Sequence, residues 1–375
     1  MLLVPSLSVQ GLGSPYYQIT PLAGYGGFFG ADYLNNVGQV AGFFTPLKGD
    51  HEHNWTYSFF YDSRPGGGTT VAGITLPGGG NQPGYDYGSS ISDFNDKGQA
   101  LAAVTNGSHV AVLDAKTGKE TLVDLPANYR ARSIDDAGRI YGDLSTPGQF
   151  GYRPFIYEDG KVQLLDLPAG TTSAGFVDAN NAGQVLAYGT DGSNRQAFLF
   201  SNGAWSKLGD FMPTRLNAGG DVLGLGGVGG SEALFLAHGT TSPIDLGNTA
   251  FSGSWTWKEA PPYSFGVYDL NDKGDLVGQL AGHDGHGFLY QGGVTTDLNS
   301  LIDASSGWVI KEAVSINDLG QIVALTNRGY ALLTPDGLPA PPDLALPNLP
   351  PVPEPSAYIV FGTLAIAFVW RRSRR

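Results

Sequence analysis

Closely spaced Asn and Asp side chains recur along the chain and are the first candidates for chemistry. Seven segments share an apolar residue, an Asn or Asp, usually a second one, and then Gly. They are Leu34-Asn35-Asn36-Val37-Gly38, Phe94-Asn95-Asp96-Lys97-Gly98, Ile134-Asp135-Asp136-Ala137-Gly138, Ala179-Asn180-Asn181-Ala182-Gly183, Leu216-Asn217-Ala218-Gly219-Gly220, Leu270-Asn271-Asp272-Lys273-Gly274 and Ile316-Asn317-Asp318-Leu319-Gly320. Their oxygens suit Ca²⁺, but a calcium loop needs acids at alternate positions before the Gly, where Lys97 and Lys273 stand. Hairpin turns are the favoured interpretation, and calcium binding is the alternative.

Two histidine pairs are the next candidates. His51-Glu52-His53 and His283-Asp284-Gly285-His286 each offer two imidazoles to a metal ion. A chain of 375 residues with 6 His produces such pairs by chance, so we predict no metal site. The chain also has no Gly-x-Ser-x-Gly, Walker or His-Glu-x-x-His motif. We therefore predict no catalytic residue and no cofactor.

Composition favours a turn-rich β protein. Gly contributes 56 residues and Pro 24, while charged residues make up only 15%, against about 25% in an average soluble domain. Without the four arginines at the C-terminus, the net charge of −13 becomes −17. A body this acidic repels phosphate backbones, so we predict no nucleic-acid partner. The chain has no Cys, which excludes disulfides and thiolate chemistry.

The seven segments repeat every 37 to 60 residues, close to the roughly 40 to 50 residues of a propeller blade. Four short strands with Gly- or Asn-containing turns fit each unit. In the sixth unit they are residues 267–270, 275–280, 287–290 and 294–298. We therefore predict an all-β, seven-bladed β-propeller over residues 15–336 with negligible helix.

The seventh unit lacks a fourth strand of its own. Unpaired sheet edges are avoided in folded proteins, so we predict that residues 17–20 pair with this unit. In a four-stranded meander the seven Asn/Asp turns then share one face. The excursions at 45–56, 143–153 and 247–262 share the opposite face. Aromatic side chains with polar neighbours suit stacking on sugars, so we predict a ligand face there, formed by Trp55, Trp255, Trp257, His51, Glu52, His53 and Glu259. Packing of these tryptophans against the ring is the alternative.

Both ends of the chain differ from the repeats. Residues 1–14 are interpreted as the remnant of a signal peptide, and because the first basic residue is Lys48, we expect the recorded start to lie inside a longer one. A Pro-rich linker at 337–351 is expected to be extended. Residues 352–375 follow it: Val352, Pro353, Glu354, Pro355 and Ser356, an uncharged run from Ala357 to Trp370, and the basic cluster Arg371, Arg372, Arg374 and Arg375. As a helix the run is about 21 Å long. We predict a short hydrophobic helix that enters a membrane with its arginines on the cytoplasmic side.

This tail resembles the PEP-CTERM sorting signal of Gram-negative bacteria that export polysaccharide. The resemblance implies recognition by an exosortase, a membrane Cys transpeptidase, with cleavage near Pro353-Glu354-Pro355, and transient anchoring in the inner membrane. The repeats resemble HAF-type extracellular repeats, best at Ile316-Asn317-Asp318-Leu319-Gly320-Gln321 and His286-Gly287-Phe288-Leu289. That resemblance implies an extracellular location and little about activity.

Three functions stay open at this point. The favoured one is a non-enzymatic binding or matrix protein at the cell surface that engages exopolysaccharide. A propeller hydrolase acting on glycans is the second, for which two carboxylates about 5 to 10 Å apart in one cleft would be evidence. A purely structural envelope component is the third.

Overall fold

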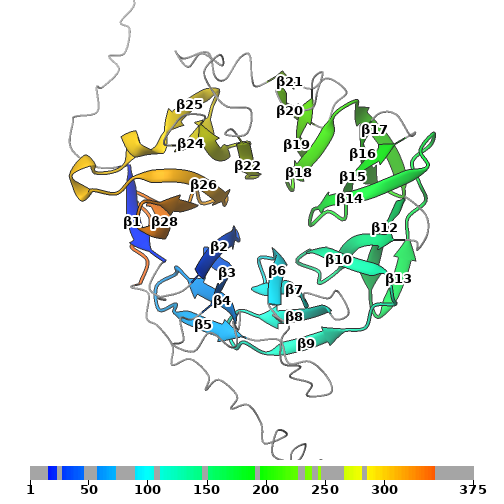
Figure 1. Cartoon of the computed structure of the whole chain (residues 1–375), viewed down its shortest axis with the longest axis horizontal. Coiled ribbons are helices and arrows are strands. Elements are labelled where there is room, and N and C mark those ends of the chain that lie inside the picture. The colour runs from blue at the N-terminus through cyan, green and yellow to red at the C-terminus, as the bar shows by residue number, and fades with distance from the viewer. Residues whose placement is uncertain are drawn as a thin grey trace, which may run out of the picture. The chain divides into compact units, whose positions relative to one another are not determined.

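The computed structural model of the chain describes residues 16–22, 28–45, 57–72, 89–104, 110–145, 151–190, 195–226, 233–238, 244–245, 266–280 and 285–342. These residues form seven four-stranded sheets, which stand around a common centre as a ring (Figure 1). Six sheets take their four strands in chain order. The first of these strands lies nearest the centre (Figure 1). The predicted all-β propeller is confirmed.

The strand bounds follow the repeats. The first three sheets are β2 (Phe28–Leu34), β3 (Gln39–Thr45), β4 (Tyr57–Asp62) and β5 (Thr69–Ala72); β6 (Ser89–Phe94), β7 (Gln99–Val104), β8 (Val110–Asp114) and β9 (Glu120–Val123); and β10 (Tyr129–Ile134), β11 (Ile140–Ser145), β12 (Tyr152–Glu158) and β13 (Lys161–Leu164). The next two are β14 (Ser173–Ala179), β15 (Val185–Thr190), β16 (Arg195–Ser201) and β17 (Ala204–Gly209); and β18 (Met212–Leu216), β19 (Asp221–Gly226), β20 (Ala233–His238) and β21 (Ile244–Asp245). The last two are β22 (Gly266–Leu270), β23 (Leu276–Leu280), β24 (His286–Gln291) and β25 (Val294–Asp297); and β26 (Ile310–Ile316), β27 (Ile322–Thr326), β28 (Gly329–Pro335) and β1 (Tyr17–Pro21).

The last sheet closes the ring with a strand from the other end of the chain. β1 pairs antiparallel with β28, with Tyr17 opposite Pro335 and Pro21 opposite Ala331. The Asp336 amide extends this pairing by donating to the Tyr16 carbonyl at 2.9 Å. The prediction that residues 17–20 pair with the seventh unit is confirmed.

The core lies between neighbouring sheets as well as within them. One buried cluster joins Leu34, Val40 and Phe59 of the β2–β5 sheet to Val323 and Leu332 of the closing sheet. Clusters of this kind recur around the ring, because both faces of each sheet are covered by its neighbours. Burial of apolar side chains is the main favourable contribution to folding, so the ring is stabilised at its sheet-to-sheet contacts.

Helical structure is limited to two 3-10 segments in the described residues, η2 (Leu298–Leu301) and η3 (Ala304–Ser306). Both lie in the connection from β25 to β26. The described part of the chain contains no helix long and apolar enough to cross a bilayer. Most of the predicted linker and the whole predicted tail lie outside the described residues, as do residues 1–14.

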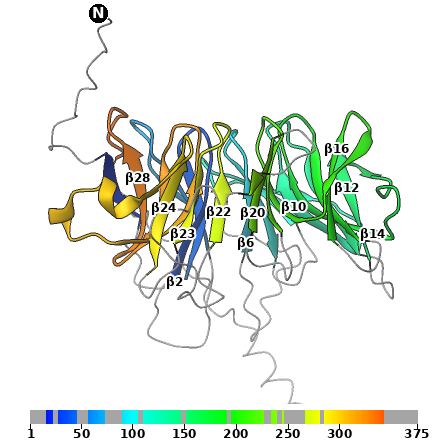
Figure 2. The ribbon, with the colours of Figure 1, turned by 90° about the horizontal axis from the view of Figure 1, so that it is seen from above.

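The strands run between two faces of the ring, seen from the side in Figure 2. We call the face that carries the seven Asn/Asp turns the turn face and the opposite one the loop face. The strand ends that border segments 46–56 and 146–150 point to the loop face, because each of these segments joins a second strand to a third. The start of β1 at Tyr16 and the end of β28 at Asp336 lie on the turn face, where Pro335 also approaches Gly320 of the seventh turn.

Candidate functional site

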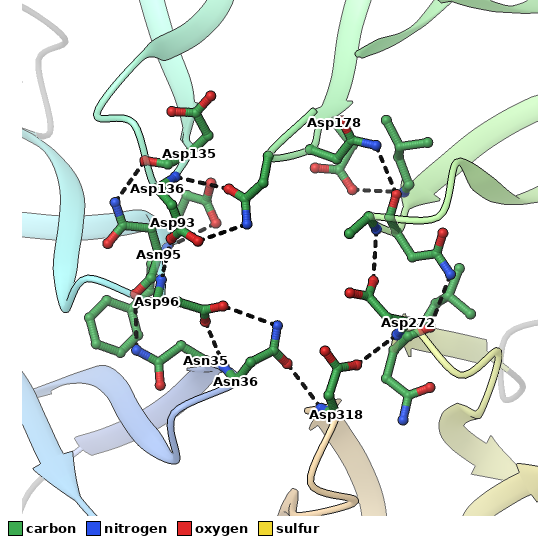
Figure 3. A pocket seen from close by; sticks show the side chains of 18 of the residues that line it. Asn35, Asn36, Asp93, Asn95, Asp96, Asp135, Asp136, Asp178, Asp272 and Asp318 are labelled. Atoms are coloured by element: carbon green, nitrogen blue, oxygen red, sulfur yellow. Dashed lines mark hydrogen bonds between the residues drawn. The ribbon is translucent and has the colours of Figure 1, made fainter. Parts of the chain in front are cut away.

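The seven Asn/Asp turns are built alike, and together they surround a central cavity (Figure 3). In each turn the first Asn or Asp accepts a hydrogen bond through its side-chain Oδ1 from the backbone amide four residues later, at 2.8 to 3.1 Å. The Gly three residues after it has a positive φ in every copy, as at Gly38 (83°) and Gly274 (77°). Only Gly adopts this conformation without strain, which explains the fixed Gly. The prediction of hairpin turns is confirmed.

The first residue of each turn also binds the next sheet. Its side-chain amide donates to the backbone carbonyl of the corresponding residue in the neighbouring turn, at 2.8 to 3.2 Å. These links run from Asn35 to Asn95, Asn95 to Asp135, Asn180 to Asn217, Asn217 to Asn271, Asn271 to Asn317 and Asn317 to Asn35. We call this ring of contacts the amide belt. It has one interruption, between Asp135 and Asn180, because a carboxylate cannot donate.

Arg139 replaces the missing link. In six turns the amide of the first Asn also donates to a Gln or Asp side chain four residues later. At Asp135 the direction is reversed, since Arg139 occupies that position and its Nε donates to Asp135 Oδ2 at 2.6 Å. The guanidinium then reaches the next sheet, where Nη2 donates to the Asn181 carbonyl at 3.3 Å. Asp135 thus stands where the other turns have Asn, and Arg139 stands where they have Gln or Asp.

A second ring of contacts, the carboxylate belt, uses the second residue of each turn. Its backbone amide donates to the side-chain oxygen of the corresponding residue in the next turn, at 2.7 to 2.9 Å. The links run from Asn36 to Asp96, Asp96 to Asp136, Asp136 to Asn181, Ala218 to Asp272, Asp272 to Asp318 and Asp318 to Asn36. The interruption is at Ala218, which has no side-chain oxygen to accept from Asn181. Hydrogen bonds between the turns therefore join each sheet to its neighbour. The spacing of the repeats alone did not predict these contacts.

Restoring the missing oxygen should stabilise the ring. In Ala218→Asn, the new Oδ1 is expected to accept from the Asn181 amide, as Asn36 and Asn181 accept elsewhere in the belt. One added hydrogen bond contributes about 0.5 to 1.5 kcal/mol, measured as an increase in the free energy of unfolding in urea. Ala182→Asn makes the same change at an exposed turn position outside the belt and is expected to stay within about 0.5 kcal/mol of wild type. Equal effects of Ala218→Asn and Ala182→Asn on stability would contradict the conclusion that the carboxylate belt lacks one hydrogen bond at Ala218.

The cavity enclosed by the turns has a volume of about 220 Å³ and is strongly acidic. Eight aspartates line it, and none of its described lining residues is Lys or Arg. Three of them, Asp93, Asp178 and Asp269, come from the ends of inner strands, and in each case the strand has a β-bulge just before the aspartate. We call these three the cavity aspartates.

Each cavity aspartate binds the next sheet. Asp93 Oδ2 accepts from the Ser133 hydroxyl at 2.6 Å and from the Ile134 amide at 2.8 Å. Asp269 Oδ2 has the same contacts with the Ser315 hydroxyl and the Ile316 amide, at 2.7 and 2.9 Å.

Asp178 Oδ2 accepts from the Leu216 amide at 2.9 Å, but Arg215 stands where the other pairs have Ser. Arg215 Nε lies 3.7 Å from Asp269 Oδ1, another of the cavity aspartates.

Burial and mutual repulsion weaken the acidity of these carboxyls. Burial raises the pKa of Asp178 to about 7, with a further increase from the charge of Asp93, while Arg215 opposes both effects. Burial also raises the pKa of Asp93, and the hydrogen bonds from Ser133, Ile134 and Phe94 oppose it. Burial also raises the pKa of Asp96, which lines the same cavity.

The hydrogen bonds decide what the cavity can do chemically. Both Asp96 oxygens accept from Asn36, and both Asp178 oxygens accept from backbone amides. Carboxylates committed in this way are poorly placed to move a proton or to bind a cation. The described residues contain no group of three or more His, Asp or Glu side chains arranged to hold a metal ion.

The predicted ligand face can be compared with the structure only in part. Trp55, Trp255, Trp257, His51, Glu52, His53 and Glu259 all lie outside the described residues, and so do His283 and Asp284. His286 is described: its Nδ1 lies 2.6 Å from Asp297 Oδ2. The cavity aspartates and Arg139 were not predicted as site residues. An alignment of the seven repeats on their Asn would have placed Asp93, Asp178 and Asp269 in one column.

Comparison with known proteins supports the fold alone. No family model matches the sequence, and no curated protein matches it. Among solved structures, an acylaminoacyl peptidase from Pyrococcus horikoshii superposes with a TM-score of 0.53 and 12% identity, covering 90% of this chain and 54% of that one. The chain thus spans about half the length of that peptidase.

The β-propeller domain of the Trilobed protease from Pyrococcus furiosus is similar over almost its whole length. It superposes with a TM-score of 0.53 at 12% identity, covering 87% of this chain and 99% of that one. That domain is described as having an open velcro topology. In the present chain β1 and β28 pair within one sheet. The likeness to this domain supports the β-propeller fold of the chain.

Proposed function

We propose that this chain is an exported cell-surface or matrix protein, whose propeller body binds or scaffolds without catalysing a reaction. Its C-terminal tail is the sorting signal, cut by an exosortase after transient anchoring in the inner membrane. The body engages exopolysaccharide. The proposal for the tail rests on the order of Val352-Pro353-Glu354-Pro355-Ser356, the apolar run and the arginine cluster. We propose further that the seven sheets act as seven blades of one closed ring, followed by the linker and the hydrophobic helix.

The two belts are the observation that supports a scaffold. Side chains that look chemically versatile in the sequence instead join each sheet to the next through backbone groups. A ring fastened at its centre and closed by β1 keeps both faces fixed, which suits a surface that presents loops to a partner. A glycan array with the full chain separates binding from a purely structural role: no bound glycan would favour the structural role.

The tail makes a direct prediction. Replacing Pro353, Glu354 and Pro355 by alanine removes the expected recognition motif, so uncleaved protein is expected to accumulate in the inner membrane of an exosortase-containing host. Mass spectrometry of the cell fractions measures the ratio of intact to processed chain. Pro347→Ala with Pro350→Ala changes the linker only and should leave processing unchanged. Normal processing of the motif variant would refute the sorting proposal.

A glycan hydrolase is the alternative, and one observation favours it. Several carboxylates converge in one cavity, and Asp178, with a pKa of about 7, resembles a general acid. The hydrogen bonds to both of its oxygens count against this role. Release of new reducing ends from polysaccharide by the wild type, but not by Asp178→Asn, would favour the hydrolase over the scaffold.

A further inference from the structure

A cluster of arginine and tyrosine side chains lies on the loop-face half of two adjacent sheets. Arg130 and Arg132 come from β10, the inner strand of one sheet. Tyr188 comes from the end of β15 in the next sheet, and Arg195 from the start of β16. All three arginines are exposed, and Tyr188 is half-buried. The body carries an excess of acid, so this grouping is a local reversal of its charge.

One buried aspartate organises the cluster. Asp143 Oδ1 accepts from the Phe176 amide of the neighbouring sheet at 2.6 Å, and Asp143 Oδ2 accepts from Arg132 Nε at 2.9 Å. Burial raises the pKa of Asp143, and the Phe176 bond and the charges of Arg132 and Arg130 oppose that increase. Asp143 therefore holds Arg132 in place through one nitrogen. The terminal nitrogens of Arg132 have no hydrogen-bond partner among the described residues.

Tyr188 lies beside Arg195, in the sheet next to that of Arg130 and Arg132. The Arg195 guanidinium carbon lies 5.9 Å from the centre of its ring. Gly175 stands opposite Tyr188 on β14, and a Cβ there would come within 2.4 Å of the ring. Burial raises the pKa of the Tyr188 hydroxyl, Asp143 and Tyr152 add to this increase, and Arg195 and Arg132 oppose it. Asp143, which holds Arg132, accepts from Phe176, the residue after Gly175, so the two arginines belong to neighbouring parts of adjoining sheets.

We propose that this cluster binds the carboxylate groups of an acidic polysaccharide, one whose sugars are uronates. The inference rests on the proposed binding function and names its ligand class. A guanidinium group pairs with a carboxylate through two parallel hydrogen bonds, and an aromatic ring beside such a pair offers an apolar surface to a sugar. The cluster lies away from the face that carries Tyr16 and Asp336. The described chain continues to Pro342, whose carbonyl accepts from Tyr61 of the β2–β5 sheet and not from the two sheets of the cluster.

The test compares an acidic and a neutral polymer on the full chain. Polygalacturonate, which carries one carboxylate per sugar, is titrated by calorimetry, with dextran as the neutral probe. Arg132→Gln with Arg195→Gln is expected to weaken polygalacturonate binding at least tenfold. Arg64→Gln with Lys116→Gln removes the same charge from exposed positions on the turn face and is expected to change binding less than twofold. Arg195→Gln alone, which breaks no ion pair within the described residues, covers the case in which the double variant unfolds.

The possible outcomes separate this inference from the proposed function. Binding of dextran but not of polygalacturonate would overturn the inference and leave a glycan-binding body in place. Binding of neither polymer, together with an empty glycan array, would remove the binding function as well. Equal losses of polygalacturonate affinity in the cluster variant and the control variant would overturn the inference, because binding would then depend only on net charge. Equally tight binding of polyglutamate would overturn the choice of a sugar ligand.

Discussion

Replacing Tyr17 by alanine is expected to lower the free energy of unfolding by about 3 to 5 kcal/mol, the usual range for truncating a large buried aromatic side chain. Tyr17 is 3% exposed. Its ring belongs to a buried cluster that contains Leu333 of β28 and also Val277 and Leu289 of the preceding sheet. The substitution therefore weakens both the attachment of β1 and the contact between two sheets.

Urea unfolding measures this loss, and the neighbouring residue supplies the control. Tyr16→Ala removes the same kind of side chain from a site that is 50% exposed, although its ring contacts Tyr17 at 5.2 Å. We expect it to change stability by less than about 1 kcal/mol. If Tyr17→Ala is as mild as Tyr16→Ala, β1 does not hold the ring closed.

Local signals predicted much of the fold. Each Asn/Asp turn contains its Gly at the position that requires a positive φ, so the hairpins could be predicted from single segments. The sixth unit has its strands at 266–270, 276–280, 286–291 and 294–297, within two residues of the predicted bounds. Ring closure could be predicted by counting strands. The seventh unit had only three strands of its own, and the N-terminal strand at residues 17–20 had no unit to join.

The belts could not be predicted from the turns one at a time. Asn35 binds the carbonyl of Asn95, 60 residues away, and Asn317 binds that of Asn35, 282 residues away. Such contacts depend on the closed ring, which no single repeat encodes. Comparison of the repeats does contain one signal: where Asp135 replaces Asn, Arg139 replaces Gln or Asp four residues later. That paired change indicates a contact between the two side chains.

The predicted site shows the limit of composition arguments. Trp55, Trp255 and Trp257 were chosen for their residue type in long excursions, and their segments lie outside the described residues. The Arg/Tyr cluster was not predicted, because Arg132 and Arg195 are 63 positions apart and lie on different sheets, which adjoin through the Asp143–Phe176 hydrogen bond. The positive charge of this cluster also cannot be inferred from the net charge of the chain, which is −13.

Stability is expected to rise as the pH falls from 8 to 5, with Asp178 as a main cause. The pKa of Asp178 is about 7 in the folded protein and about 3.9 in an unfolded chain. The folded state therefore holds this proton more tightly. Above pH 7 both states are ionised, and the folded state carries the penalty of a partly buried charge. As the pH falls through 7 the carboxyl is neutralised and that penalty is relieved, by about 2 to 3 kcal/mol at pH 5.

Urea unfolding at pH 5, 6, 7 and 8 tests this expectation. Asp178→Asn has no titrating group at this site, so its gain in stability between pH 8 and pH 5 should be smaller than the wild-type gain by about 2 kcal/mol. The stability of this variant at any single pH is a poorer guide, because its new side-chain NH₂ group can face the Ala179 amide, which donates to Asp178 in the wild type. Asp114→Asn is the control: bonds from Thr117 lower the pKa of Asp114, so its titration falls below this pH window. If Asp178→Asn keeps the wild-type slope, the cavity does not hold Asp178 in its neutral form at pH 5.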